Sequence, residues 1–163
     1  KGDDKLIDLL KKNKYLFFRG SEKNVLSRYY NVGKKFNADY VVRVTADCPF
    51  INYKIVDKLL KIKKRNCFSY LSNIEPRSFP KGLDVEVIKF SLLKKVFIKK
   101  KNPKILEHVT YSIRKSNKIK KYNLKYSRDL SKFNICVDYE NDLKNVRDIY
   151  SKYGILNFSL KKL

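Results

Sequence analysis

The sequence of 163 residues has no methionine or tryptophan and few cysteines, glycines and prolines. Its three cysteines, Cys48, Cys67 and Cys136, form no CxxC pair, so the sequence indicates neither a disulfide framework nor a zinc site. No apolar run approaches the ~20 residues of a membrane span, and no signal-peptide pattern opens the chain. These absences predict a soluble, cytoplasmic protein with reduced thiols. Since the chain starts at Lys1 without methionine, we expect its natural start to lie elsewhere.

Acidic residues are also scarce, with 16 against 39 basic ones and a net charge of +23. A charge this high raises the hypothesis of a nonenzymatic basic domain that binds nucleic acid. However, only eight of the basic side chains are arginine, the residue that favours bidentate readout of phosphates and bases. The abundance of lysine alongside asparagine, isoleucine and tyrosine is typical of an AT-rich genome. The composition therefore gives little support to nucleic-acid binding, which we keep as the alternative function.

Short apolar runs alternate with longer amphipathic ones, which predicts a single α/β domain over residues 1–163 with a mostly parallel sheet. Ser21, Asn52 and Asn102 are candidate helix N-caps, and Gly154 is a candidate helix stop. The predicted strands are 15–18, 40–45, 67–72, 83–88, 119–126 and 133–137. The predicted helices are 3–13, 21–36, 52–65, 91–100, 103–115 and 140–154. A loop of about ten residues, 73–82, interrupts the pattern, and loops of this length are often functional.

Two aspartates follow apolar predicted strands, Asp47 after 40–45 and Asp138 after 133–137. If both strands are parallel members of one sheet, their carboxyl ends lie on the same edge, where α/β folds bind ligands. Two carboxylates there would suit Mg²⁺, which prefers carboxylate, phosphate and water oxygens. The alternative is that each aspartate only caps the helix that follows it.

Several ordered motifs of the chain resemble the cytidylyltransferase family of spore coat polysaccharide biosynthesis protein F, whose relatives include the CMP-KDO and acylneuraminate cytidylyltransferases. The motifs are FFRGSEKNVLSRYYNVGKKFNADYVVRVTADCPFI, SYLSN, PRSFPKGLDVEV, EHVTYSIR and VDYENDLKNVRDIY. The resemblance implies a Rossmann-like nucleotide-diphospho-sugar transferase fold, an α/β/α sandwich. It implies a Mg²⁺-dependent enzyme that activates a sugar or sugar acid with CTP as its CMP derivative and releases pyrophosphate, in polysaccharide or glycan biosynthesis. By analogy, a homodimer is expected.

The resemblance also implies roles for individual residues. Asp47 and Asp138 match the metal-binding, catalytic aspartates of the family. Residues that match its substrate-binding and nucleotide-binding motifs are Arg77, Asp84, Glu86, Glu107 and His108 on the sugar side and Arg19, Ser21 and Arg28 on the nucleotide side. Alternative interpretations are a solvent-facing strand position for Glu86, a packed or surface position for His108, and capping or surface charge for the nucleotide-side residues.

The chain departs from the family pattern in two places. It reads VDYEND where relatives have VDTPED, and it has no glycine-rich basic loop to cradle the CTP phosphates. The resemblance therefore implies the C-terminal part of an N-terminally truncated domain, without its first strands and phosphate loop, that does not turn over CTP alone. A family member that has lost catalysis is a further alternative.

Overall fold

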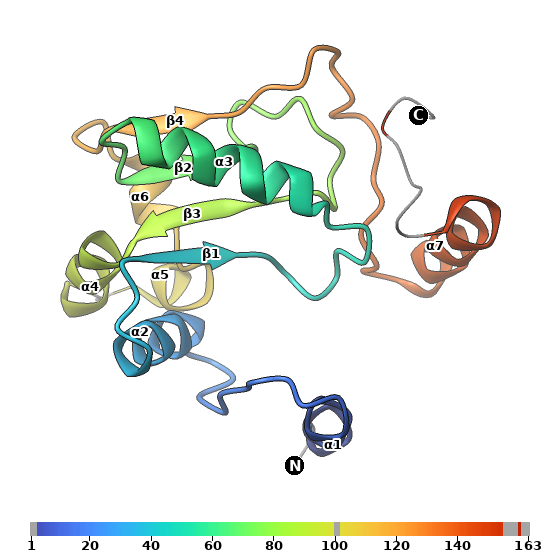
Figure 1. Ribbon diagram of the computed structural model, residues 1–163, viewed down its shortest axis with the longest axis horizontal. Coiled ribbons are helices and arrows are strands. Elements are labelled where there is room, and N and C mark those ends of the chain that lie inside the picture. The colour runs from blue at the N-terminus through green and yellow to red at the C-terminus, as the bar shows by residue number, and fades with distance from the viewer. Residues whose placement is uncertain (1–2, 100–101, 155–159, 161–163) are drawn as a thin grey trace.

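The computed structural model describes residues 3–99, 102–154 and 160, which form helices on both faces of a small sheet (Figure 1). In chain order the elements are α1 (Asp4–Lys12), α2 (Val25–Lys35), β1 (Tyr40–Arg43), α3 (Tyr53–Arg65), β2 (Tyr70–Ser72), β3 (Glu86–Lys89), α4 (Phe90–Ile98), α5 (Pro103–Glu107), α6 (Tyr111–Lys115), β4 (Lys121–Asn123) and α7 (Glu140–Tyr153). None of the described helices has the length and hydrophobicity needed to span a membrane.

The strands form one four-stranded mixed sheet in the order β1-β3-β2-β4. β3 runs antiparallel to both β1 and β2, whereas β2 and β4 are parallel, so β1, β2 and β4 share one direction. The register places Val42 opposite Val87, and Val87 opposite Leu71. This arrangement confirms the predicted Rossmann-like α/β fold with a mixed sheet.

Alternation along the central strands produces two hydrophobic clusters, one on each face of the sheet. Leu71 and Val87 point to the face covered by α3, where Leu59 is fully buried. Tyr70 and Ile88 point to the other face, which is covered by residues of α2, α4 and α6. Burial of each large aliphatic side chain contributes about 1.5–3 kcal/mol, so the sheet is stabilised from both sides.

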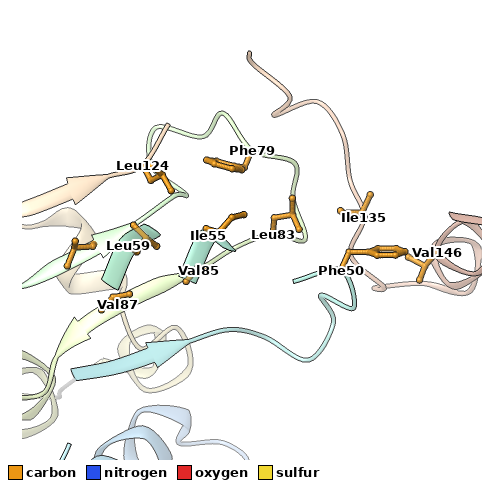
Figure 2. Close-up of a cluster of buried hydrophobic side chains, with 11 residues drawn as sticks. Phe50, Ile55, Leu59, Phe79, Leu83, Val85, Val87, Leu124, Ile135 and Val146 are labelled. Carbon is orange, nitrogen blue, oxygen red and sulfur yellow. The ribbon is translucent and has the colours of Figure 1, made fainter. Parts of the chain in front are cut away.

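Figure 2 shows that the first of these clusters extends beyond the sheet, where Phe50, Ile135 and Val146 lie together toward α7. Phe50 belongs to the loop after β1 and Ile135 to the segment before α7. Their packing brings the two chain segments that carry Asp47 and Asp138 into one core.

Side-chain caps fix several helix starts. Asn52 accepts a hydrogen bond from the main-chain N–H of Lys54 at the start of α3 (2.9 Å), and Asn102 caps α5 in the same way. Gly154 ends α7 with φ of +65°, as the sequence predicted. Ser21 is not the N-cap of α2: the helix starts three residues later than expected, and Asn24 caps it by accepting from the N–H of Ser27.

Two predicted strands are absent from the described structure. Residues 15–18 have no strand partner, and Leu16 is 84% exposed. Apolar, aromatic residues favour a strand only where a neighbouring strand pairs with them. Residues 133–137 run beside the 73–82 loop and form a single parallel bridge, Asn134 with Lys81, so Ile135 and Cys136 are buried although the segment does not join the sheet.

The predicted helix 103–115 is divided into α5 and α6. Val109 lies between them with φ of +30°, a backbone conformation that interrupts a helix, and its side chain is fully buried against the second cluster. Packing of Val109 therefore overrides the helical periodicity of the sequence.

The predicted strand ranges 67–72, 83–88 and 119–126 are correct in place but contain only three or four paired residues each.

Candidate functional site

Asp47 and Asp138 come to the same end of the sheet through main-chain contacts. The N–H of Val137 donates to the carbonyl of Asp47 at 2.8 Å. The segment 133–137 is tied in turn to the 73–82 loop, since Lys81 N–H donates to Phe133 O and Ile135 N–H donates to Lys81 O, both at 2.9 Å. Three segments that are remote in sequence are thereby held together. The prediction that a strand of the sheet carries Asp138 is wrong, because 133–137 forms only an isolated bridge.

Gly82 allows the loop and the 133–137 segment to approach this closely. Its φ is +107°, and a Cβ at this position would lie 2.8 Å from the carbonyl carbon of Ile135. A side chain would therefore suffer both backbone strain and a clash with main-chain atoms. The glycine sets the spacing between the segment that carries Lys81 and the one that carries Asp138.

Asp47 is half-buried and surrounded by hydrogen-bond donors. Burial alone would raise its pKa, but hydrogen bonds from the Thr45 hydroxyl, its own N–H and the Cys48 thiol, together with the charge of Lys81, hold the pKa below its usual value. The carboxylate is therefore ionised at neutral pH. It is prepared to bind a cation.

Asp138 is exposed and pairs with Lys81, whose Nζ donates to Asp138 Oδ2 at 2.7 Å. This bond is the main cause that raises the pKa of Lys81, with a further contribution from the charge of Asp47. One ammonium group therefore interacts with both predicted metal ligands. The main-chain N–H groups of Asp138 and Tyr139 donate to Asp142 Oδ2, which fixes the turn into α7.

Two cysteines lie next to the aspartates in the sequence: Cys48 follows Asp47, and Cys136 precedes Asp138 by two positions. Their sulfurs are 3.8 Å apart, both side chains are buried, and Cys48 Sγ is 3.6 Å from Asp47 Oδ1. Burial raises the pKa of the Cys48 thiol, and burial together with Cys48 and Asp47 raises that of Cys136 to about 12. Both are protonated thiols at neutral pH. The sequence favoured burial of all three cysteines, which is correct for Cys48 and Cys136 and wrong for Cys67, because its side chain is exposed after the end of α3.

The 73–82 loop brings Arg77 to the same region. Its guanidinium binds Asp84 through two hydrogen bonds of 2.6 and 2.7 Å, and these bonds are the main cause that raises the Arg77 pKa. Buried Asn73 closes the base of the loop by bonding the carbonyl of Leu83 and the N–H of Val85, each at 2.8 Å. The predicted sugar-side residues Arg77 and Asp84 are thus a preformed, half-buried ion pair.

Glu86 has a different environment from the one predicted. It is 1% exposed, accepts from Arg43 Nη1 and from the Tyr70 hydroxyl, both at 2.5 Å, and links β1, β3 and β2. The interpretation of Glu86 as a solvent-facing strand residue is wrong. Contact between Glu86 and a substrate would require this buried network to open.

Glu107 and His108 are exposed at the end of α5. Among the described residues, no hydrogen bond or ion pair joins their side chains to Asp47, Asp84 or Asp138. His108 agrees with the surface alternative. The predicted substrate-binding role of this pair is not supported by proximity to the aspartates, and it stays a prediction.

The nucleotide-side residues lie before and within α2. Arg19 pairs with Asp4 at 2.5 Å, and Ser21 Oγ accepts from the N–H of Asn24 at 3.0 Å. Arg28 lines a cavity of about 490 Å³ along β1, together with Val25, Tyr29 and residues Val41 to Ala46. Arg28 therefore borders a hollow whose lining ends at Ala46, the residue before Asp47, and binding of a nucleotide by Arg19, Ser21 and Arg28 stays a prediction.

The most informative residue that the sequence interpretation missed is Lys81. It is one of many lysines, and only its place after Pro80 in the irregular loop distinguishes it. Thr45 was missed as well, because a hydroxyl two residues before an aspartate has no distinctive signature. Both act through contacts that depend on the fold.

A family profile described as cytidylyltransferase matches residues 3–158. An uncharacterized protein of Methanocaldococcus jannaschii is 29% identical over 166 residues, which cover 100% of this chain and 67% of that protein. The spore coat polysaccharide biosynthesis protein SpsF of Bacillus subtilis is 26% identical over 151 residues, which cover 88% of this chain and 60% of that protein.

A solved structure of a cytidylyltransferase from Leptospira borgpetersenii serovar Hardjo-bovis superposes with a TM-score of 0.91 at 32% sequence identity. The match covers 96% of this chain and 67% of that chain, so this chain spans about two thirds of the length of the proteins it resembles. The profile match over nearly the whole chain and the shared fold lead to one conclusion. The chain belongs to the cytidylyltransferase family.

Proposed function

We propose that the protein carrying this chain is a Mg²⁺-dependent cytidylyltransferase that activates a sugar or sugar acid as its CMP derivative. The likeness to SpsF supports a place in the biosynthesis of a polysaccharide or another glycan. The single observation that carries the proposal is the convergence of Asp47 and Asp138, from two remote segments, beside Lys81.

The donor set at this point fits a hard divalent cation. Asp47 is ionised, and Asp138 is exposed and can exchange its Lys81 contact for a metal contact. Carboxylate oxygens with phosphate and water are the ligands that Mg²⁺ prefers. Bound there, the ion would neutralise charge on the triphosphate, while Asp47 and Asp138 hold it in place.

Lys81 supports the same chemistry from the protein side. Its ammonium group is half-exposed, and it is held next to the aspartates by Asp138. When a cation takes the carboxylates, the ammonium group becomes free to bind a phosphate oxygen. Lys81 then acts as a point charge on the leaving pyrophosphate or the α-phosphate.

The reaction needs no covalent intermediate. A hydroxyl oxygen of the sugar attacks the α-phosphorus of CTP, the bond from that phosphorus to the bridging oxygen breaks, and pyrophosphate leaves. The hydroxyl proton passes to water. Catalysis of this kind depends on positioning the two substrates and neutralising the charge of the phosphates. Side chains can do this when main-chain hydrogen bonds fix the segments that carry them.

Arg77 is the residue we assign to the acceptor. Asp84 holds its guanidinium by two bonds, and Nη1 also donates to the carbonyl of Pro80 at 3.5 Å, which leaves the Nε–H and one Nη2–H for hydroxyl or carboxylate groups of a sugar. Because the pair is preformed, little side-chain entropy is lost when the acceptor binds.

The test is pyrophosphate release from CTP and Mg²⁺ by the full-length protein against a panel of sugars and sugar acids. Turnover that requires CTP rather than ATP, GTP or UTP is the expected result. Absence of nucleotide binding and turnover with every acceptor would overturn the proposal and favour a family member without catalysis. Salt-sensitive binding of DNA or RNA in place of turnover would favour the basic binding domain.

A further inference from the structure

We propose that Asp47, Cys48 and Cys136 form a binding site for a thiophilic divalent cation such as Zn²⁺, distinct from the Mg²⁺ site and sharing Asp47 with it. Among the described residues, this is the group of His, Cys, Asp and Glu side chains close enough to share an ion, with its ligand atoms within 4.8 Å of one another. The binding proposal does not depend on the proposed function.

Two of the three separations within the cluster match those of a tetrahedral zinc site. With Zn–S near 2.3 Å and Zn–O near 2.0–2.2 Å, two coordinating sulfurs lie about 3.8 Å apart, and a sulfur and an oxygen lie about 3.6 Å apart. The two sulfurs are 3.8 Å apart, and Cys48 Sγ is 3.6 Å from Asp47 Oδ1. Cys136 Sγ and the Asp47 carboxylate lie within 4.8 Å of each other, so a movement of about 1 Å or less brings this third pair to the same geometry.

The cluster is preorganised by its surroundings. Asp47 O and Val137 N are hydrogen-bonded at 2.8 Å, which fixes the segment of Cys48 relative to that of Cys136. Thr45 Oγ1 lies 3.1 Å from Cys48 Sγ and can donate to that sulfur, as outer partners of metal thiolates do. Both thiols are buried, while the half-buried Asp47 gives the ion an entry path.

The chemistry of the donor set separates this site from the proposed magnesium site. Two sulfurs and one carboxylate select a soft or borderline cation, whereas Asp47 with Asp138 offers oxygen only. The ion would displace two thiol protons on binding. Because both sites use Asp47, occupation of the sulfur site would withdraw one ligand from Mg²⁺ and inhibit the proposed reaction; this consequence alone rests on the proposed function.

The first measurement is a titration of metal-free protein with Co²⁺ and then Zn²⁺. We expect one ion per chain, a thiolate-to-cobalt charge-transfer band, ligand-field bands of tetrahedral cobalt, and loss of these bands when Zn²⁺ is added. Cobalt binding without the charge-transfer band would overturn the proposal, as would the absence of zinc binding.

The variants Cys48→Ser and Cys136→Ser are each expected to lower the band by at least half, because one of two thiolates is lost, and to weaken zinc binding more than the 10–100-fold typical of outer-shell partners. Cys67→Ser is the matched control, because Cys67 is exposed and lies outside the cluster. A band of full intensity in Cys136→Ser, or a weakened band in Cys67→Ser, contradicts the assignment. Far-UV circular dichroism shows whether each variant folds. If a serine variant does not fold, the presence or absence of the charge-transfer band in the wild type decides whether the proposal stands.

Asp138→Asn separates the two metal sites. It is expected to keep the cobalt band, because Asp138 supplies no ligand to the sulfur site, but to lose the Mg²⁺-dependent turnover. An intact cobalt band with no turnover in the wild type would overturn the proposed function and leave the zinc site standing. Turnover that zinc does not inhibit in the wild type would overturn the inhibitory consequence.

Discussion

Lys81 Nζ donates to Asp138 Oδ2 at 2.7 Å, although the two residues are 57 positions apart in the sequence. The contact exists because the 73–82 loop and the 133–137 segment are hydrogen-bonded to each other. It gives the candidate site a positive charge of its own. The lysine and a bound cation would therefore compete for the Asp138 carboxylate.

Asp47→Asn and Asp138→Asn are each expected to lower turnover by at least about 100-fold, since each removes half of the charge proposed to hold Mg²⁺. The measurement is pyrophosphate release at saturating CTP, with Mg²⁺ varied. Asp57→Asn, on the exposed side of α3, is the control and should retain activity. Full turnover in both site variants would show that the ion is bound elsewhere.

Lys81→Gln should strengthen Mg²⁺ binding by about 1.4–5-fold, because an exposed ion pair is worth about 0.2–1 kcal/mol and Asp138 loses that competitor. The same variant should lower turnover, since the CTP phosphates lose the positive charge of the Lys81 ammonium group. Calorimetric titration with Mg²⁺ and initial rates measure the two effects. Lys94→Gln on α4 serves for comparison, and a similar gain in affinity there would mean that net charge alone is responsible.

Gly82→Ala should destabilise the fold by about 1–3 kcal/mol or more, because φ of +107° is strained for alanine and the new Cβ meets Ile135 at 2.8 Å. Gly154→Ala is the matched control: its φ is +65°, and nothing lies within 4 Å of a Cβ there. Urea denaturation measures the unfolding free energy of both variants. Equal losses of unfolding free energy would show that the close approach to Ile135 carries no cost.

Glu86→Gln should cost about 3 kcal/mol of unfolding free energy, because it leaves the Arg43 guanidinium without a counter-charge in a mostly buried network. Tyr70→Phe removes one neutral donor from the same carboxylate and should cost about 2 kcal/mol, within the range of hydrogen bonds to charged groups. Thermal and urea unfolding of the two variants give the comparison. If Tyr70→Phe is the more damaging change, hydrogen bonding rather than charge governs the network.

The three cysteines should differ sharply in reactivity. Thiolates are the reactive form, so Cys136, with a pKa raised to about 12, and Cys48, with a raised pKa, should be inert at neutral pH, whereas exposed Cys67 should react quickly. A disulfide reagent should modify one thiol in the native protein and three in denaturant. Rapid reaction of Cys136 below pH 9 would contradict its burial and raised pKa.

Much of the fold could be predicted from the sequence because its determinants are local. Asn52, Asn102 and Gly154 bound helices as expected, and alternation identified β3. Residues 15–18 show where local reasoning fails: an apolar run is the same whether or not a neighbouring strand exists to pair with it. Val109 is a second case, since its buried packing is a property of the tertiary structure.

The candidate site was predictable in part for the same reason. Asp47 and Asp138 both stand out because each follows an apolar run, and the family resemblance implied a metal-binding role for both. The cluster of Asp47 with Cys48 and Cys136 could not be predicted, because a zinc site is recognised in a sequence by close spacing of its ligands, and these cysteines are 88 positions apart.

The hydrogen bond from Val137 N–H to Asp47 O joins main-chain atoms, so nineteen of the twenty amino acids at position 137 retain the donor. Side chains around the site can therefore vary widely during evolution without changing the distance between its two carboxylate-bearing segments. Proline is the exception, because it has no N–H. Position 137 is closed to this one residue for a reason that neither hydrophobicity nor side-chain volume would indicate.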